Sequence, residues 1–304
     1  MQPPTAALQG LSGARELSRR YRVDGRRAFA LRDFDPADCG PLRDADEPRA
    51  RALTARATAR LAELQTRLYA QNRWALLVLF QGMDASGKDS AIRHVLAGVN
   101  PQGVQVFSFK QPSEEELDHD FLWRTSRCFP ERGRIGVFNR SYYEEVLVAR
   151  VHPEVLARQR LPARLVTPRI WRERFEDIRA LERYATRQGI AVRKFFLHVS
   201  SGEQRRRLIE RIDEPEKHWK FHPGDVALRK HWRAYQRAYA DAIRATAAPH
   251  APWYVVPADR KWYARLVIAA ALVDALEALR PAFPKLTPAE RREFAAARRA
   301  LERG

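Results

Sequence analysis

The sequence predicts an α/β domain in which a parallel sheet is flanked by helices in three layers. Strand-like and helix-like segments alternate along the chain, and this order produces parallel sheets covered on both faces. The first strand, WALLVLF at 74–80, is a continuous apolar run, as expected of a strand buried on both faces. The glycine-rich segment GMDASGKD at 82–89 follows at once, and a helical pattern follows that. Strand, glycine loop and helix together indicate a phosphate site.

The individual elements follow from hydrophobic periodicity and from helix start and stop signals. Pro112 with Ser113 opens one helix, Thr167 with Pro168 opens another, and Gly189 ends the latter. Strands are predicted at 74–80, 104–109, 134–139, 191–199 and 253–257, and helices at 47–70, 91–99, 114–129, 140–151, 167–187, 201–213, 226–245 and 261–279.

Three regions are expected along the chain. Residues 1–70 form an N-terminal arm, irregular over 1–46, and an amphipathic helix; residues 71–282 form the main α/β domain, which contains the glycine-rich loop. Residues 283–304 form a polar tail with some helical character. Neither an internal repeat nor a low-complexity block interrupts this organisation.

Composition excludes several classes of protein. Hydrophobic residues at 45% can supply a sizeable core, which excludes a disordered chain. No apolar run approaches the roughly 20 residues that span a bilayer, and the N-terminus lacks the pattern of a secretory signal. Two cysteines provide neither a disulfide framework nor a metal-ligand spacing. A soluble cytoplasmic protein without a membrane partner is expected.

The net charge of +18 attracts polyanions such as nucleic acid, acidic lipid or polyphosphate. An arginine-rich composition set by the genome is the alternative explanation. Only eight of the 55 cationic residues are lysines. Four of these lysines occur where phosphates are expected, and we interpret them as compact point charges that contact phosphate: Lys88, Lys110, Lys217 and Lys220.

The loop matches seven of the eight letters of the phosphate-binding pattern G-x-x-x-x-G-K-[ST]. Gly82 and Gly87 allow backbone conformations that point amide groups at a phosphate, and the following helix adds its positive end. Lys88 supplies the charge that follows a transferred phosphoryl group. The whole segment is predicted to contact phosphate: Gly82, Ala85, Ser86, Gly87, Lys88 and Asp89.

Two carboxylates in this loop need a separate explanation. Phosphoryl transfer between polyanions uses Mg²⁺ to neutralise oxygens, and Asp84 is the first candidate ligand, with local turn capping as the alternative. Asp89 replaces the usual hydroxyl. It either stabilises the helix start or holds the ligands and waters of the metal in place, and the two interpretations are equally favoured.

The segment FNRSYYEE at 138–145 ends another strand at the same edge of the sheet. An acid commonly orients magnesium at this place, but here Asn139 occupies it. Arg140 is predicted to point at phosphates, with a surface position as the alternative. One of Tyr142 and Tyr143 could flank a base, although at least one of them is expected in the core, and Glu144 could meet an amino group or a water.

The segment RRRLIERIDEPEKHWKF at 205–221 combines a basic helix with a basic loop. Kinases of this architecture close such lids over the reacting phosphates and exclude water. A solvated basic face is the alternative for any single arginine. None of the eight histidines has metal-site spacing.

These motifs resemble the polyphosphate kinase 2 family over about residues 30–280. The resemblance rests on GMDASGKDSAIRHVLAGVNPQGVQVFSFKQPS, HDFLWRTSRCFPERGRIGVFNRSYYEEVLVARVHPE, KFFLHVSSGEQRRRLIERIDEPEKHWKF and APWYVVPADRKWY. It implies a thymidylate-kinase-like fold, a lid at about 205–224 and a basic channel for the polymer.

The resemblance also implies Mg²⁺-dependent transfer, with Mn²⁺ as a substitute, between inorganic polyphosphate and nucleotides. Asp84 and Lys88 fall at the catalytic pair of the loop, and Asn139 and Arg140 at the second motif. Further phosphate contacts are expected at Lys110, Arg205, Arg211, Lys217 and Lys220. A homo-oligomer, either a dimer or a tetramer, is also expected.

Many family members read FDRSWYN where this chain reads FNRSYYE. The departure resembles the subgroup of polyphosphate:AMP/ADP phosphotransferases (class III), which carry AMP through ADP to ATP. One rival is an ATP-dependent nucleoside monophosphate kinase, which would not explain so large a positive charge. The other is a nucleic-acid-binding protein, which would need base-reading elements that the sequence lacks.

Overall fold

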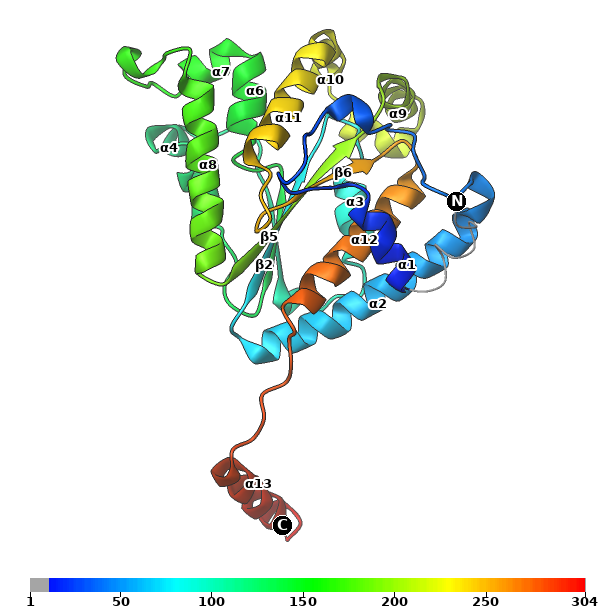
Figure 1. Ribbon diagram of the computed structural model, residues 1–304, viewed down its shortest axis with the longest axis vertical. Helices are drawn as coiled ribbons and strands as arrows, with labels where there is room; N and C mark the ends of the chain where they lie inside the picture. Colours follow the sequence, from blue (N-terminus) through cyan, green and yellow to red (C-terminus); the bar gives the residue numbers. More distant parts are fainter. Residues whose placement is uncertain (1–10, 304) are drawn as a thin grey trace.

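Six strands form a single sheet in the computed structural model, which describes residues 11–303 (Figure 1). Five strands run parallel, and the short β1 joins one edge antiparallel. The predicted α/β class with a parallel sheet between helices is confirmed. The order across the sheet is β1 (Arg22–Val23), β6 (Trp253–Pro257), β5 (Ile190–His198), β2 (Ala75–Gln81), β4 (Ile135–Asn139) and β3 (Val104–Ser108).

The five strands predicted from the sequence are present, each within about one residue of its predicted bounds. Every residue of β2 is buried, as its uninterrupted apolar run indicated. The sequence missed β1, because two residues are too short to show a period-two pattern.

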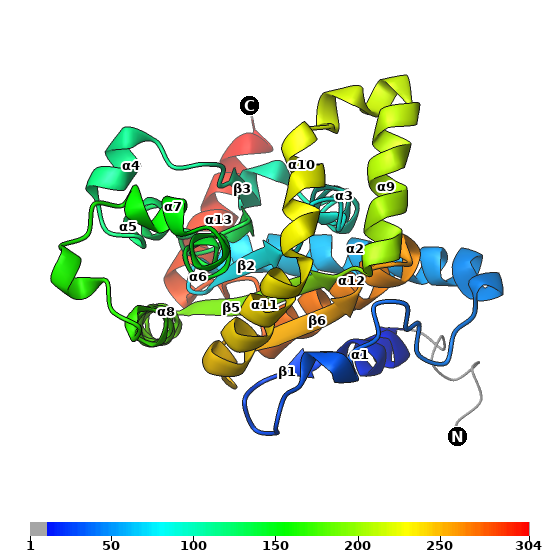
Figure 2. The same cartoon turned by 90° about the horizontal axis from the view of Figure 1, so that it is seen from above.

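Two groups of helices cover opposite faces of the sheet (Figures 1 and 2). One group packs α12 against α1, α2 and α3, and the other packs α6, α8 and α11 together. The helices are α1 (Leu11–Arg19), α2 (Glu47–Gln71), α3 (Lys88–Val95), α4 (Glu114–Asp118), α5 (Trp123–Ser126), α6 (Glu144–Val151), α7 (Pro153–Ala157), α8 (Ile170–Arg187), α9 (Ser201–Asp213), α10 (Pro223–Leu228), α11 (Trp232–Thr246), α12 (Lys261–Ala278) and α13 (Pro288–Leu301).

Five helix predictions were wrong in detail. The helices expected over 140–151 and 167–187 begin later, at Glu144 and at Ile170. The helix expected over 114–129 is split into α4 and α5, because His119 is extended and Asp120 accepts a hydrogen bond from the amide of Leu122. The helix expected over 91–99 starts three residues earlier, at Lys88, and ends at Val95. The helix expected over 226–245 is divided by the 3₁₀ turn η7 (Arg229–His231).

The N-terminal arm, predicted to be irregular, contains α1 and β1 within its described part. Tyr21 is buried, and its hydroxyl lies 2.8 Å from the hydroxyl of Tyr263 in α12. Leu17 and Val23 are buried in the same core. The apolar residues of this arm therefore cover α12 and the β6 edge of the sheet. The part of the arm before Leu11 lies outside the described residues.

The polar tail contains α13, which stands apart from the sheet (Figure 1). A capping box formed by Thr287 and Glu290 starts this helix, and none of its residues is buried. The division of the chain at 70 and 282 stays a prediction. Within residues 11–303, no helix is long and apolar enough to cross a bilayer.

A buried ionic network joins the sheet to α8 and α6. Lys194 in β5 is 0% exposed and Glu182 in α8 is 1% exposed, and Lys194 Nζ lies 2.6 Å from Glu182 Oε2. The hydroxyls of Tyr142 and Tyr143 lie 3.0 and 2.9 Å from the other oxygen of Glu182. Removing one member of such a pair is costly, because the other charge stays buried without a partner.

Replacement of Lys194 by methionine should lower the free energy of unfolding by about 3–5 kcal/mol, because Glu182 would be left as an uncompensated buried charge. Urea denaturation followed by circular dichroism measures this change. The double variant Lys194→Met/Glu182→Leu should regain part of the loss.

Arg298→Met is the control, since the Arg298–Glu302 pair on α13 is 81% and 57% exposed. It should cost less than about 1 kcal/mol. Equal losses for Lys194→Met and Arg298→Met would contradict a stabilising role for the buried network.

Candidate functional site

A cavity of about 790 Å³ lies at the carboxyl ends of β2, β4 and β3, beneath α9 and α10. Register places the ends of the strands side by side, since Phe80 in β2 pairs with Asn139 in β4. Ten lysine and arginine side chains line the cavity against four carboxylates. Those charged residues are Lys88, Arg93, Lys110, Arg140, Arg207, Arg211, Lys217, Lys220, Lys261 and Arg265, with Asp84, Asp89, Glu210 and Asp225.

The predicted phosphate loop connects β2 to α3 and forms one wall of this cavity. A Cβ at Gly82 would approach Ser86 Oγ to 2.6 Å and the carbonyl of Leu197 to 3.0 Å, so the position requires glycine. Gly87 has φ +102° and Ala85 has φ +61°. These left-handed conformations turn the chain sharply before α3 begins, and such turns gather backbone amides into an anion-binding concavity.

Lys88 lies inside the loop. Its Nζ donates hydrogen bonds to the carbonyls of Gly82 (2.7 Å) and Met83 (3.3 Å). Burial and the nearby charge of Arg140 lower the pKa of Lys88, while Asp84, Glu144 and Asp89 oppose the shift. The amine is thus held at the base of the cavity, where a bound anion would strengthen its charged form.

Each acid of the loop meets one residue of the second motif. Arg140 Nη2 donates to Asp84 Oδ1 at 3.0 Å, and Asn139 Nδ2 donates to Asp89 Oδ1 at 2.5 Å. Arg140 itself has φ +64°. The two motifs, 50 residues and more apart in the chain, therefore form one polar cluster across the ends of β2 and β4.

This cluster offers oxygen ligands of the kind that Mg²⁺ prefers. Mg²⁺ commonly uses one or two carboxylates together with substrate phosphates and keeps several waters. Asp84 and Asp89 match that donor set, and both line the cavity. Among residues 11–303, no three His, Cys, Asp or Glu side chains converge as a ready-made metal site. A divalent ion would thus depend on the substrate for its remaining ligands.

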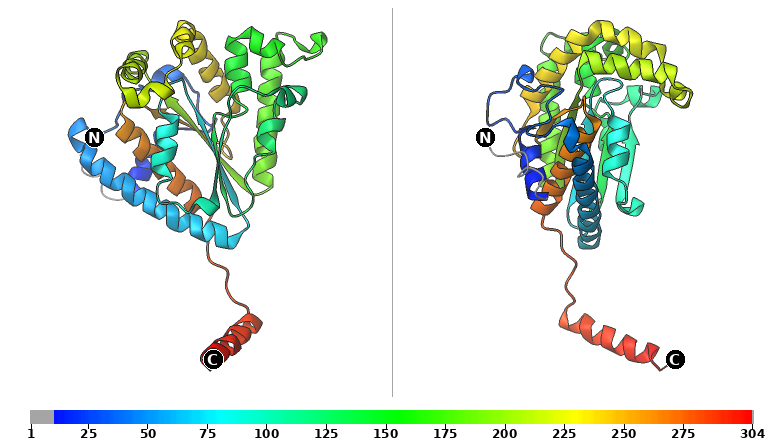
Figure 3. Two further views of the ribbon diagram at one scale, coloured as in Figure 1. Left: turned by 180° about the vertical axis from the view of Figure 1, so that it is seen from behind. Right: turned by 90° about the vertical axis from the view of Figure 1, so that its right-hand side faces the viewer.

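The predicted lid consists of α9, η6 (Pro215–Lys220) and α10, which rise over the carboxyl ends of the strands (Figures 2 and 3). Arg211, Lys217 and Lys220 line the cavity, as the sequence indicated. Acids of the lid partly balance them: Arg211 donates to Asp225 at 3.0 Å, and Lys217 contacts Glu210. Trp219 is 79% exposed at the same rim.

The structure corrects three predicted contacts. Tyr142 and Tyr143 are both 0% exposed, so neither can flank a nucleotide base; their hydroxyls belong to the Glu182 network. Arg205 is exposed on the outer side of α9 and is not part of the cavity wall. Glu144 accepts a hydrogen bond from Gln81 at 2.7 Å and is not among the residues that line the cavity.

The sequence analysis did not identify four cations of the cavity wall, of which Arg207 comes from α9. Arg93 comes from α3, and Lys261 and Arg265 come from the first turns of α12. Arg265 donates to Ser90 Oγ at 2.9 Å, which joins the two helices. Two features of the sequence could have indicated the cations of α12. Lysine is scarce in this chain, which draws attention to Lys261, and Arg265 lies on the same helix face at i+4.

The comparisons with known proteins agree on one family. The family model described as polyphosphate kinase 2 matches residues 44–284. The chain is 52% identical over 243 residues to an ADP-polyphosphate phosphotransferase of Rhodopseudomonas palustris, covering 80% of this chain and 84% of that protein. It is 43% identical to an AMP/ADP-polyphosphate phosphotransferase of Meiothermus ruber over 267 residues, covering 88% and 96%.

A solved structure is similar along nearly the whole chain. The crystal structure of polyphosphate kinase 2 from Arthrobacter aurescens has a TM-score of 0.82 and 38% sequence identity. The match covers 91% of this chain and 95% of that one.

Lys88→Ala should abolish phosphoryl transfer, a loss of at least about 10²–10³-fold, because the buried cation at the base of the cavity would be gone. Initial rates and a thermal melt together measure the effect. Lys285→Ala, in the exposed segment before α13, is the matched control. Retained activity in a folded Lys88→Ala protein would refute the role of this lysine.

Proposed function

The chain belongs to the polyphosphate kinase 2 family, and we propose that it transfers phosphoryl groups from inorganic polyphosphate to AMP and ADP, giving ADP and ATP reversibly. The names of the two similar phosphotransferases support these substrates. The observation that carries the proposal is the excess of cations in the cavity, ten against four acids.

That excess fits a donor with many phosphates better than a mononucleotide. Each cation held in a concave, partly desolvated wall attracts anions strongly, because low-dielectric walls focus the field. AMP carries a single phosphate group, whereas polyphosphate carries a negative charge on each residue of the chain. A cavity wall that combines Lys110, Arg93 and Lys261 with the loop can hold several successive phosphates at once.

The residues of the site have different roles in phosphoryl transfer. Backbone amides of the loop and the Lys88 ammonium bind the phosphoryl group that moves, and Arg140 faces it from the opposite wall. Asn139 keeps the carboxylate of Asp89 in place through its hydrogen bond. The lid cations, including Arg211 and Lys220, contact phosphates from above and limit access of water.

We assign Mg²⁺, with Mn²⁺ as a substitute, to the carboxylates of Asp84 and Asp89. When bound, the ion neutralises phosphate oxygens on both sides of the transferred group. The remaining assignments belong to the same proposal: a cytoplasmic location, assembly as a homo-oligomer, and no specific binding of nucleic acid.

Incubation of the protein with AMP, Mg²⁺ and long-chain polyphosphate, in the absence of ATP, should yield ADP and then ATP, which chromatography resolves. Replacing polyphosphate by ATP should give far less ADP per unit time. Product formed from ATP and AMP alone would favour the rival monophosphate kinase. No product from polyphosphate would refute the proposed function.

Asn139→Asp should change the ratio of the initial rates with AMP and ADP by severalfold. A second carboxylate would face Asp89 at the present 2.5 Å contact, and like charges at that distance rearrange or recruit a cation. Asn100→Asp, at the start of η4 (Pro101–Gly103), is the control. An unchanged ratio would remove the link between the second motif and the acceptor.

A further inference from the structure

Every backbone carbonyl of the phosphate loop, from Gly82 to Gly87, accepts a hydrogen bond from another group of the protein. Lys88 Nζ donates to the carbonyls of Gly82 and Met83, and the amide of Ala91 donates to the carbonyl of Gly87. The three carbonyls between them are held by two side chains of the lid helix α9. Gln204 Nε2 donates to Asp84 O at 2.9 Å, and Arg207 Nη1 donates to Ala85 O at 3.1 Å and Ser86 O at 3.0 Å.

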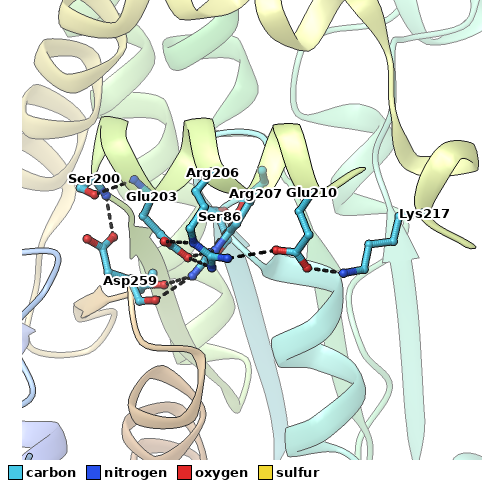
Figure 4. Close-up of polar contacts among 10 residues, drawn as sticks. Ser86, Ser200, Glu203, Arg206, Arg207, Glu210, Lys217 and Asp259 are labelled. Carbon is cyan, nitrogen blue, oxygen red and sulfur yellow. Dashed lines mark hydrogen bonds and ion pairs between the residues drawn. The ribbon is translucent and has the colours of Figure 1, made fainter. Parts of the chain in front are cut away.

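Arg207 uses its entire donor capacity in this arrangement (Figure 4). A guanidinium has five N–H groups in a fixed plane. Nε donates to Glu203 at 2.7 Å, and Nη1 donates to the two loop carbonyls. Nη2 donates to the carbonyls of Ala258 (2.6 Å) and Asp259 (3.0 Å), just after β6. The side chain is 4% exposed, so water does not compete for these five bonds.

These contacts set the direction in which the loop presents its amides. In a planar trans peptide the C=O and the following N–H point opposite ways. Carbonyls turned toward α9 therefore turn the amides of Ala85 and Gly87 away from α9. The left-handed conformation of Ala85 costs free energy on the order of 1–3 kcal/mol, and Arg207 supplies bonds that stabilise it.

We propose that Arg207 is a positioning residue: it fixes the orientation of the loop peptides for the donor phosphate and so joins the geometry of the loop to the lid helix α9. The inference rests on the proposed function, because it concerns the same donor site. A solvated lid arginine would be exposed and interchangeable with lysine. Arg207 is neither, since lysine has three donors on one nitrogen and cannot span both sets of carbonyls.

Its neighbour Arg206 provides a matched control. Arg206 is 61% exposed and donates to Glu203 and Glu210 on its own helix. Figure 4 shows it beside Arg207 on α9, and it is not part of the cavity wall. Arg206→Lys and Arg207→Lys thus make the same chemical change at adjacent positions and preserve the charge in both.

The test compares both variants with the wild type in steady-state kinetics and in calorimetric titration with tripolyphosphate. Arg207→Lys should raise the KM for polyphosphate about tenfold or more and lower kcat, because the loop amides lose their orientation. Its KM for AMP should stay the same. Tripolyphosphate should bind correspondingly more weakly, and Arg206→Lys should match the wild type in every measurement.

The measured KM and kcat values distinguish a positioning role of Arg207 from a purely structural one. A structural role alone would reduce the fraction of active protein, which lowers apparent kcat and leaves both KM values unchanged; that result would overturn the proposal. Equal KM values for polyphosphate in Arg207→Lys and Arg206→Lys would overturn it as well.

If Arg207→Lys fails to fold, Gln204→Met removes the donor of Asp84 O, together with the side-chain acceptor of Arg229 Nη1. It should show the same split with a smaller rise in KM. A wild-type KM for polyphosphate in folded Gln204→Met would then count against the proposal. If the wild-type protein transfers no phosphate from polyphosphate, the proposed function fails. The calorimetric comparison would still decide whether Arg207 orients an anion-binding loop.

Discussion

The pairing of β2 with β4 on one side and β5 on the other is the constraint on which the site depends. Because all three strands are parallel, their carboxyl ends meet at one edge, and the loops that follow them face one cavity. The phosphate loop follows β2, the second motif follows β4, and the lid follows β5. Parallel pairing therefore brings together three segments that the sequence separates by about 50 residues each.

Charged side chains in the interior of the protein differ from those in the cavity in whether they have partners of opposite charge. Deep in the protein Lys194 is matched with Glu182, and Arg207, which also lines the cavity, is matched with Glu203 and four carbonyls. In the cavity, cations are left in excess. A buried unmatched charge is costly unless a ligand compensates it, so the surplus marks where an anion is missing. The acids of the loop do not cancel it, because the cavity holds ten cations and only four acids.

Local sequence patterns predicted the strands, the loop and the lid, because these depend on residues close together in the chain. They could not predict which tyrosine is buried. Tyr142 and Tyr143 follow a functional motif, yet both hydroxyls donate to Glu182, more than 35 residues away, and Lys194 donates to that of Tyr143. Arg207 shows the same limit. Three adjacent arginines at 205–207 look alike in the sequence, and their helix phase against the phosphate loop decides that one is buried and two are exposed.

The distribution of lysine and arginine distinguishes function from composition. Five of the eight lysines line the cavity, against five of the 47 arginines. An arginine-rich composition imposed on the whole surface would not concentrate lysine in this way. Lysine presents a compact, mobile charge that can follow a moving phosphoryl group, whereas arginine holds a fixed plane of donors. The cavity uses the first property at Lys88 and Lys110, and the wall behind it uses the second at Arg207. The net positive charge of the protein attracts a polyanion, and the positions of the lysines determine where its phosphates bind.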